Sequence, residues 1–229
     1  MSLNLWGLSL WREVADLCEA ECVDVACLQE VDRHYRDRSR WDDVPARAAD
    51  ELGWEWAYAP AIFLPDTTGT RQYGNAVLTR LPLLGRREHA LAPEVEWTEP
   101  DDSLTEPRIL LEAVIEAPWG GLLRIGCTHL ADVVNPEDEW IGRRQVADIL
   151  RVVRDPAWTH VPTVLTGDFN ARVGSELLGD LETSLRLVAV EQPHVDHLFI
   201  SDGLRATEAR LLGPCGSDHL PLLCDLVPA

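Results

Sequence analysis

Short apolar runs of strand length, separated by polar loops, dominate the chain. They are bounded by charged residues, Gly or Pro, and many are rich in Val, Ile and Leu, as buried strands are. The predicted strands cover residues 3–6, 24–29, 54–59, 75–79, 86–91, 108–117, 122–128, 163–167, 195–201, 207–212 and 220–226.

Two stretches have the periodicity of amphipathic helices instead. In residues 11–22 one helical face carries Val14, Leu17, Cys18 and Cys22. Residues 136–153 start with Pro136, which suits a first helical turn. Their apolar positions are Ile141, Val146, Ile149, Leu150 and Val153. Because strands far outnumber helices, the pattern predicts an α/β protein in which two packed sheets have helices outside, rather than a simple βαβ alternation.

The polar stretch 95–107 is the nearest feature to a domain boundary. It contains no Gly/Ser-rich or Pro-rich spacer, so we interpret it as a long loop inside one domain that covers residues 1–229. No run reaches 18 apolar residues, and the apolar opening segment 2–11 has no basic residues before it. With six cysteines and no CxxC pair, the expectation is a cytoplasmic protein with no membrane segment.

The chain contains no lysine, and all 20 basic residues are arginine. Lysine-dependent chemistry is thereby excluded, including Schiff-base aldolases, pyridoxal-phosphate enzymes, P-loop nucleotide triphosphatases and kinases. A net charge of −19 also opposes nonspecific wrapping of nucleic acid. A GC-rich genome or a saline habitat would produce the same composition without any functional cause.

Polar residues stand directly at the ends of several buried apolar runs. The pairs and triplets are Gln29-Glu30, Thr128-His129, Asp168-Phe169-Asn170 and Ser217-Asp218-His219. In packed-sheet enzymes such positions meet at one edge, where loops hold the reacting groups on a rigid scaffold. We therefore expect these side chains to form one site.

The residue types at these ends indicate a reaction class. Carboxylate and amide oxygens suit a hard cation such as Mg²⁺, with Mn²⁺ as an alternative, and histidines can move protons or hold phosphoryl oxygens. The chain has no HExxH motif and no GxSxG motif. His194 and His197 are three residues apart, but they are weak candidates for metal ligands. Metal-assisted attack of water on a phosphate ester is the chemistry that remains.

Eight motifs follow one another along the chain: SLNLWG (2–7), LQEV (28–31), YGNAVLTRLPL (73–83), EPR (106–108), CTHL (127–130), TGDFNA (166–171), VDHLFIS (195–201) and GSDHLPL (216–222). In this order they resemble the endonuclease/exonuclease/phosphatase superfamily, which includes pancreatic deoxyribonuclease, abasic-site endonucleases, inositol polyphosphate phosphatases and neutral sphingomyelinases. The resemblance implies a four-layer α/β sandwich like that of deoxyribonuclease I, with two mixed sheets face to face.

The resemblance also implies roles for individual residues. Glu30 would be the principal Mg²⁺ ligand, with Asn4 beside it and Asp218 on the metal side. Asp168 would orient or deprotonate the attacking water, although the identity of the base stays open. The expected supporting residues are Asn170 and His129 at the phosphate, His219 at the phosphoryl oxygens, Asp196 on the other nitrogen of His219, and Tyr73, Asn75 and Arg108 as substrate contacts or scaffold.

Two departures from the superfamily pattern affect these expectations. Some members have an acidic metal ligand two residues after the Asn, where this chain has Trp6, so a single-metal site is expected. Only three residues precede Asn4, so the first strand is either short or trimmed.

The predicted function is Mg²⁺-dependent hydrolysis of phosphate esters, as a phosphodiesterase or a phosphatase. The charge favours small esters or short single strands over long duplex DNA, and no apolar hairpin suggests a membrane. The densest basic patch has four arginines, which either pair with nearby Asp residues or hold a second phosphate: Arg33, Arg36, Arg38 and Arg40. A nuclease, and an inert binding module with the same fold, remain as alternatives.

Overall fold

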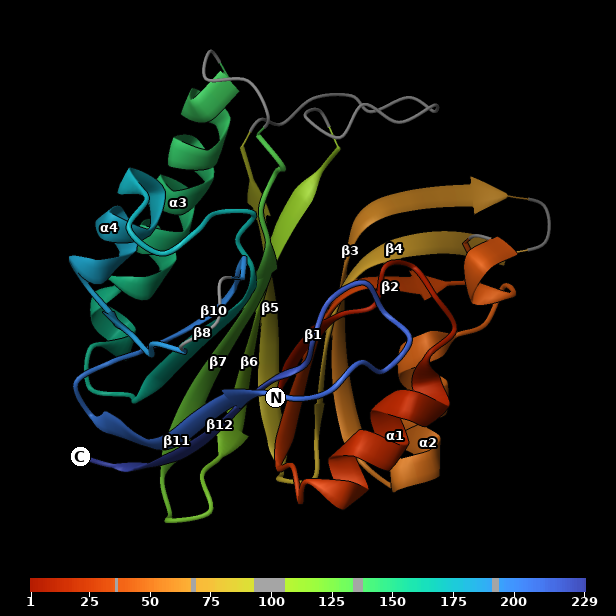
Figure 1. Cartoon of the computed structure of the whole chain (residues 1–229), viewed down its shortest axis with the longest axis horizontal. Coiled ribbons are helices and arrows are strands. Elements are labelled where there is room, and N and C mark those ends of the chain that lie inside the picture. The colour runs from red at the N-terminus through yellow and green to blue at the C-terminus, as the bar shows by residue number, and fades with distance from the viewer. Residues whose placement is uncertain (36, 67–68, 93–105, 134–137, 191–193) are drawn as a thin grey trace.

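Two mixed β-sheets of six strands each pack face to face, with helices on their outer faces (Figure 1). The computed structural model describes residues 1–35, 37–66, 69–92, 106–133, 138–190 and 194–229. This architecture is the four-layer sandwich that the sequence predicts, so the predicted fold class is confirmed.

The first sheet has the strand order β11-β12-β1-β2-β4-β3. Its strands are β1 (Ser2–Asn4), β2 (Val25–Arg33), β3 (Glu55–Asp66), β4 (Gly69–Thr79), β11 (Leu204–Leu211) and β12 (Leu222–Pro228). β1 and β2 run parallel, and the other paired strands of this sheet run antiparallel.

The second sheet has the order β5-β6-β7-β8-β10-β9. Its strands are β5 (Leu83–Leu91), β6 (Arg108–Glu116), β7 (Leu122–His129), β8 (Thr163–Asp168), β9 (Arg186–Leu187) and β10 (Asp196–Ile200). Here β7 and β8 are the parallel pair. Each sheet therefore contains one parallel pair among its described strands.

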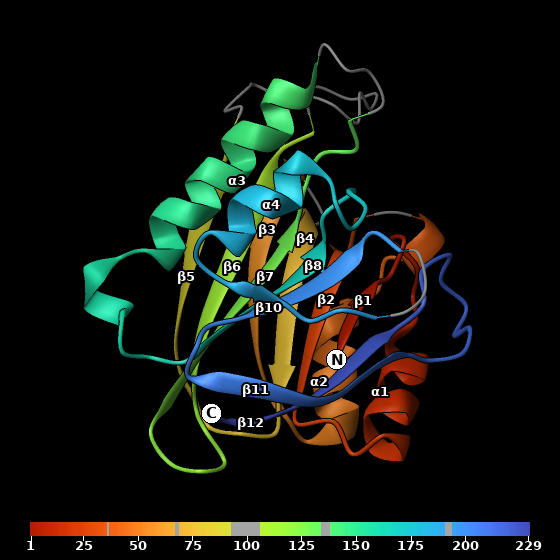
Figure 2. The ribbon, with the colours of Figure 1, turned by 60° about the vertical axis from the view of Figure 1, so that its left-hand side comes forward.

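Helices connect the two parallel pairs and cover the sheets. α1 (Trp11–Ala20) joins β1 to β2, and α3 (Glu139–Val153) joins β7 to β8. Figure 2 shows α3 beside the short helix α4 (Glu176–Glu182) over the second sheet, while α1 and α2 (Val44–Leu52) lie over the first. Two 3₁₀ turns are also present, η1 (Asp37–Ser39) and η3 (Pro156–Trp158). No described helix has both the length and the apolar character required to cross a membrane.

Apolar side chains fill three layers of the sandwich. The central layer lies between the two sheets and includes Leu111, Ile115 and Ile125. A second cluster joins α1 and α2 to the first sheet, and a third joins α3 and α4 to the second sheet. The facing surfaces of the two sheets are therefore largely apolar, and their packing sets how the strand ends meet.

The sequence missed two helices and one short strand. α2 has a clear start, because the Asp43 side chain accepts a hydrogen bond from Ala46 N, and a clear end at Gly53 in the left-handed conformation. α4 begins at the cap residue Ser175. The strands β2, β3 and β4 also continue beyond their predicted ends, since they still pair with one another past the register shifts in β2 and β3. Most of the predicted loop 95–107, and the predicted helix start at Pro136, fall outside the described residues.

The central layer yields a stability prediction. Leu111 in β6 is fully buried between the sheets, so Leu111→Ala should lower the free energy of unfolding by about 2–5 kcal/mol in urea denaturation. Leu84 in β5 is 55% exposed, and Leu84→Ala should change the free energy by less than about 0.5 kcal/mol. Equal effects of the two substitutions would contradict this arrangement of the core.

Candidate active site

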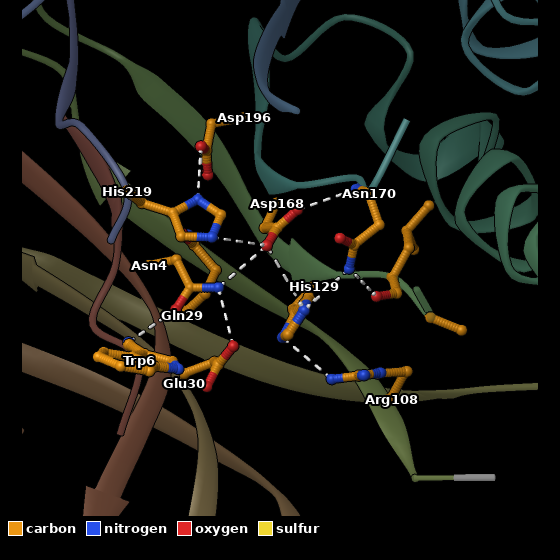
Figure 3. Close-up of polar contacts among 12 residues, drawn as sticks. Asn4, Trp6, Gln29, Glu30, Arg108, His129, Asp168, Asn170, Asp196 and His219 are labelled. Atoms are coloured by element: carbon orange, nitrogen blue, oxygen red, sulfur yellow. Dashed lines mark hydrogen bonds and ion pairs between the residues drawn. The ribbon is translucent and has the colours of Figure 1, made fainter. Parts of the chain in front are cut away.

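The carboxyl ends of both parallel strand pairs meet at one edge of the sandwich. Asn4 is the last residue of β1, His129 the last of β7 and Asp168 the last of β8. The register places His129 beside Asp168, and Asp196 at the start of β10 on the other side of Asp168. Strand ends from both sheets thus supply the polar group that the sequence predicts at one edge (Figure 3).

Glu30 reaches this edge through an irregularity in β2. The pairing of β2 with β4 shifts register between Leu28 and Val31, and Glu30 takes a positive φ of 52°. The preceding side chain, Gln29, is fully buried and donates hydrogen bonds to Ser2 Oγ and Cys127 Sγ, both at 3.2 Å. Gln29 therefore ties the two sheets together beneath Glu30, whose own side chain is half-buried.

Asp168 is at the centre of the site. Its Oδ2 accepts a hydrogen bond from Asn4 Nδ2 at 2.9 Å and lies 3.6 Å from His129 Nε2 and 3.7 Å from His219 Nε2. Its Oδ1 accepts a hydrogen bond from Asn170 N at 2.8 Å. Since Asn4 Nδ2 also donates to Glu30 Oε1 at 3.1 Å, one amide connects the two carboxylates.

Gly167 allows Asp168 to take this position. At Gly167, φ is 150°, and a Cβ atom there would lie 1.8 Å from the carbonyl oxygen of Thr128 on the neighbouring strand. Only glycine fits where β7 and β8 approach so closely. The Gly-Asp pair in the TGDFN motif is thus a packing requirement at the site.

His219 and Asp196 form a close ion pair. His219 Nδ1 donates to Asp196 Oδ2 at 2.8 Å, which leaves Nε2 directed toward Asp168. The loop that carries His219 is fastened to the first sheet, because Ser217 Oγ donates to the carbonyl oxygen of Asn4 at 2.7 Å and accepts from His219 N at 3.1 Å.

His129 is held from the opposite side by Arg108. Arg108 Nη1 donates to His129 Nδ1 at 3.0 Å and to Glu106 Oε1 at 3.3 Å. Because a guanidinium can only donate, Nδ1 must accept, and the proton of the neutral ring lies on Nε2, which faces Asp168. Asn170 Nδ2 donates to the carbonyl oxygen of Leu130 at 3.0 Å and lies 3.2 Å from His129 Nε2.

The surroundings of Asp168 and His219 raise the pKa values of both groups. Burial, and then the charge of Asp196, raise the pKa of Asp168 to about 6, against the smaller opposing effects of His219 and of the bonds from Asn170 and Asn4. Burial lowers the pKa of His219, but the hydrogen bond and charge of Asp196, followed by Asp168 and Asp218, outweigh it and raise this pKa to about 9.

His129 behaves differently from His219. Burial, and then the positive charges of Arg108 and His219, hold the pKa of His129 well below its usual value. One histidine is therefore cationic at neutral pH and the other neutral, although both face the same carboxylate.

The donor set fits a hard cation. Three carboxylates, those of Glu30, Asp168 and Asp196, stand near one cationic histidine, and Asp196 Oδ1 is buried without a hydrogen-bond partner in the described structure. Ligand atoms of Asp168, Asp196 and His219 lie within 4.8 Å of one another, but Nδ1 of His219 is already bonded to Asp196. The half-buried Glu30 is better suited to a cation that keeps several waters.

The other two predicted metal ligands have different surroundings. Asn4 Oδ1 accepts from Trp6 N at 2.9 Å and retains one lone pair for a further contact. Asp218 is exposed, and its Oδ1 lies 3.3 Å from Ser217 Oγ. Among the described residues, no hydrogen bond or ion pair joins Asp218 to Glu30.

The remaining predicted contacts are placed inside the protein. Asn75 is buried and donates from Nδ2 to the carbonyl oxygen of Ile109 at 2.9 Å, which ties β4 to the second sheet. Tyr73 is buried in a small cluster with Tyr35 and Ile62. Both side chains are therefore held by contacts inside the protein, and substrate contact by either residue stays a prediction.

The arginines of the basic patch after Glu30 lie in different environments. Arg33 donates two hydrogen bonds to Asp43, of 2.9 and 2.7 Å. For this arginine, the structure agrees with the prediction that the patch pairs with nearby Asp residues. Arg38 and Arg40 are exposed, whereas Arg36 lies outside the described residues. Arg38 stacks over the ring of Trp6, with its guanidinium carbon 5.5 Å from the ring centroid.

Sequence reasoning gave no role to two residues that shape the site. Ser217 links the His219 loop to β1, and Glu106 pairs with Arg108. The sequence carried a signal for each, since Ser217 begins the polar triplet before His219 and Glu106 belongs to the EPR motif. The partner of Ser217 lies 213 residues away, a contact that a single sequence does not display, whereas Glu106 and Arg108 are only two residues apart.

Comparison with known proteins identifies the family of the chain. A model of the family described as "Endonuclease/Exonuclease/phosphatase family" matches residues 1–219. The chain belongs to this family. No curated protein sequence matches it.

Solved structures share the fold of this endonuclease/exonuclease/phosphatase family member at low identity. A family member from Beutenbergia cavernae has a TM-score of 0.71 and 22% identity, over 95% of this chain and 65% of its own, so the present chain spans less than two-thirds of that protein. The human Nocturnin catalytic domain with bound sulfate anion has a TM-score of 0.72 and 22% identity, over 96% and 86%. A mannosyl-6-phosphatase from Bacteroides thetaiotaomicron has a TM-score of 0.68 and 15% identity, over 97% and 91%.

The charge of His219 yields a pH prediction. In protein free of divalent cations, NMR titration should give His219 a pKa of about 9, and Asp196→Asn should lower that pKa because it removes the bonded charge. Since the pKa is raised, the stability that the pair contributes is complete below pH 6.5 and is lost as the pH rises through about 9. A His219 titration near 6.5 in both proteins would contradict the pairing.

Proposed function

We propose that the protein is a Mg²⁺-dependent hydrolase of phosphate esters, acting as a phosphodiesterase or a phosphatase. The observation that carries the proposal is the position of Asp168 between two histidines of opposite protonation state, with Asn4 joining it to Glu30. A buried carboxylate that faces both a neutral imidazole and an imidazolium is suited to handling a water and a phosphoryl group together.

Glu30 would hold the Mg²⁺ ion, with Asn4 Oδ1 and Asp218 as further candidate ligands. When bound, the ion would supply charge neutralisation of a phosphoryl oxygen, a contribution typical of phosphoester hydrolases. The Asn4 amide keeps Glu30 and Asp168 at a fixed separation, so the cation and the attacking water would occupy defined positions.

Asp168 would orient the attacking water and accept its proton. With a pKa of about 6, the carboxylate is largely ionised at neutral pH and is more basic than an ordinary aspartate. The hydrogen bonds from Asn4 and from Asn170 N restrict its rotation, so a lone pair points into the site in a fixed direction.

The two histidines would contact the phosphoryl oxygens in different ways. His219, kept cationic and oriented by Asp196, would stabilise the charge that develops on those oxygens in the transition state. His129, whose proton is fixed on Nε2 by Arg108, would donate a neutral hydrogen bond to the phosphate. Asn170 is close enough to His129 to share that role.

The charge of the chain supports small esters or short single strands as substrates. A net charge of −19 repels a long polyanion everywhere except close to the site, and screening limits attraction to within about 8–10 Å at physiological salt. A mannosyl-6-phosphatase shares the fold, which is consistent with a small phosphate ester.

Removal of the metal ligand or of the cationic histidine tests the proposal. Glu30→Gln or His219→Ala should lower hydrolysis of phosphate esters with Mg²⁺ at least about a hundredfold, as expected for loss of a charge-stabilising group. The folded state is checked by circular dichroism and thermal unfolding. The exposed residues Glu51 and His160 provide matched controls, and Glu51→Gln and His160→Ala should keep full activity.

The substrate panel consists of mono- and diesters with aliphatic and aromatic leaving groups, assayed with Mg²⁺, Mn²⁺ and EDTA. Activity should be lost in EDTA and restored by Mg²⁺. If folded Glu30→Gln or His219→Ala turns over like the wild type, the assigned roles are wrong.

Metal binding separates a hydrolase from an inert module of the same fold. Calorimetric titration should show Mg²⁺ binding at millimolar or lower concentration, weakened at least about tenfold by Glu30→Gln, because even supporting residues of metal sites change affinity by that factor. Wild-type protein that takes up no Mg²⁺ in this range would favour the inert module.

A further inference from the structure

A large exposed aromatic residue stands beside the polar site. Trp6 follows Asn4 by two residues and is 46% exposed, although the molecule buries most of its large apolar side chains. Figure 3 shows its ring next to Asn4 and Glu30. Trp41, Trp119 and Trp140 are exposed as well, so the feature that distinguishes Trp6 is the place of its ring beside Asn4 and Glu30, where a bound molecule would meet it.

The backbone holds Trp6 in this place at some cost. Trp6 and Gly7 both have positive φ, of 54° and 62°. Trp6 N donates to Asn4 Oδ1 at 2.9 Å, and Gly7 N donates to the carbonyl oxygen of Glu30 at 3.1 Å. A non-glycine residue in the left-handed region is strained, and such strain persists where surrounding bonds impose it, often at functional sites. Two site residues, Asn4 and Glu30, therefore fix the tryptophan.

Arg38, in the turn η1, lies beside Trp6 and forms the second part of the exposed surface there. Its guanidinium carbon lies 5.5 Å from the centroid of the Trp6 ring. A Cβ at Gly7 would lie only 2.9 Å from Arg38 Nη2, so the glycine leaves room for the guanidinium. The arginine therefore lies against both the ring and the backbone beside it.

Arg38 differs from many arginines of this acidic chain. Arg33, Arg47 and Arg80 form ion pairs with Asp43, Asp42 and Asp24. Arg38 is exposed and has no carboxylate partner within the described segments, although the chain has 39 acidic residues. Its N–H groups remain available for oxygens of a bound molecule.

The geometry points to a ring-binding subsite made of Trp6 and Arg38, so that the substrate is a phosphate ester whose non-reacting part carries a planar ring of nucleobase size. An indole stacked on one side by a guanidinium offers a flat apolar surface with a nearby cation, which suits a planar ring joined to an anionic group. Asn4 and Glu30, which fix Trp6, place this surface next to the phosphate position.

This inference rests on the proposed function for the position of the reacting phosphate, and it goes further by naming the class of the remaining part. Trp6 would contact the ring of the substrate, and Arg38 would both hold the indole and offer its N–H groups to the anionic part of the substrate.

Binding of two ligands that differ only in the ring provides the test. Calorimetry with Mg²⁺ compares adenosine monophosphate with ribose-5-phosphate, and phosphate release is checked after each titration. The wild type should bind the nucleotide at least about tenfold more tightly, in keeping with a base stacked on one aromatic side chain. Trp6→Ala should bring the ratio of the two dissociation constants close to one, and Trp6→Phe should retain most of it.

Arg38→Ala should reduce the same ratio by a smaller factor without changing the fold. Two matched controls are available. Trp119 is 37% exposed and precedes β7, at the strand end opposite to His129, and Arg12 stacks over Trp11 on α1 at 4.6 Å. Trp119→Ala and Arg12→Ala should leave the ratio unchanged.

Failure of this inference and failure of the proposed function give different results. A wild-type ratio near one, a ratio that survives Trp6→Ala, or no detectable binding of the nucleotide would overturn the ring-binding subsite, whether or not esters are hydrolysed. A ring-dependent ratio in a protein that hydrolyses no ester would keep the subsite and contradict only the hydrolase.

Discussion

The burial of one carboxylate constrains the rest of the site. Asp168 is 2% exposed and lies beside a second buried carboxylate, Asp196, an arrangement that would be strongly unfavourable without compensation. The compensation comes from donors on separate segments: the amide of Asn4, the backbone N–H of Asn170 and the imidazolium of His219. Because each donor is held by further contacts, the position of Asp168 depends on both sheets and on the loop before β12. A change at any of these segments would therefore alter the basicity of the carboxylate as well as its position.

The two parallel strand pairs explain how both sheets contribute side chains to the surroundings of Asp168. Each pair is connected by a helix, α1 or α3, which sends both carboxyl ends to the same side of its sheet, where ligands bind in open α/β sheets. The sheets then pack so that these two ends face each other. Gln29 and Asn75 form hydrogen bonds across the largely apolar layer between the sheets and help to fix their relative placement. The hydrophobic core thus controls the distance between Glu30 and Asp168 through two buried amides.

The sequence predicts those parts of the molecule that depend on local pattern. Apolar runs that end in His129 or Asp168 locate both the strands and the reactive edge, because burial and strand length are local properties. The placement of Glu30 was not predictable in this way, since it depends on a register shift between β2 and β4. The same is true of Ser217, whose partner Asn4 is 213 residues away. α2 was missed although Asp43 and Gly53 mark its ends, because a helix of 9 residues shows the helical repeat over little more than two turns.

The cations at the site contrast with the net negative charge of the chain. The chain carries an excess of 19 negative charges, yet the edge where the strands converge has His219 as a cation, Arg108 beside His129, and Arg38 without an acidic partner in the described structure. Since exposed charges are screened over about one Debye length, these three cations offset part of the negative charge that Glu30, Asp168 and Asp196 present to a small anion at the site. The acidic remainder acts at longer range and penalises each phosphate of a polymer that extends beyond the site. For the proposed reaction, this distribution of charge would favour small or short anions over long polymers as substrates.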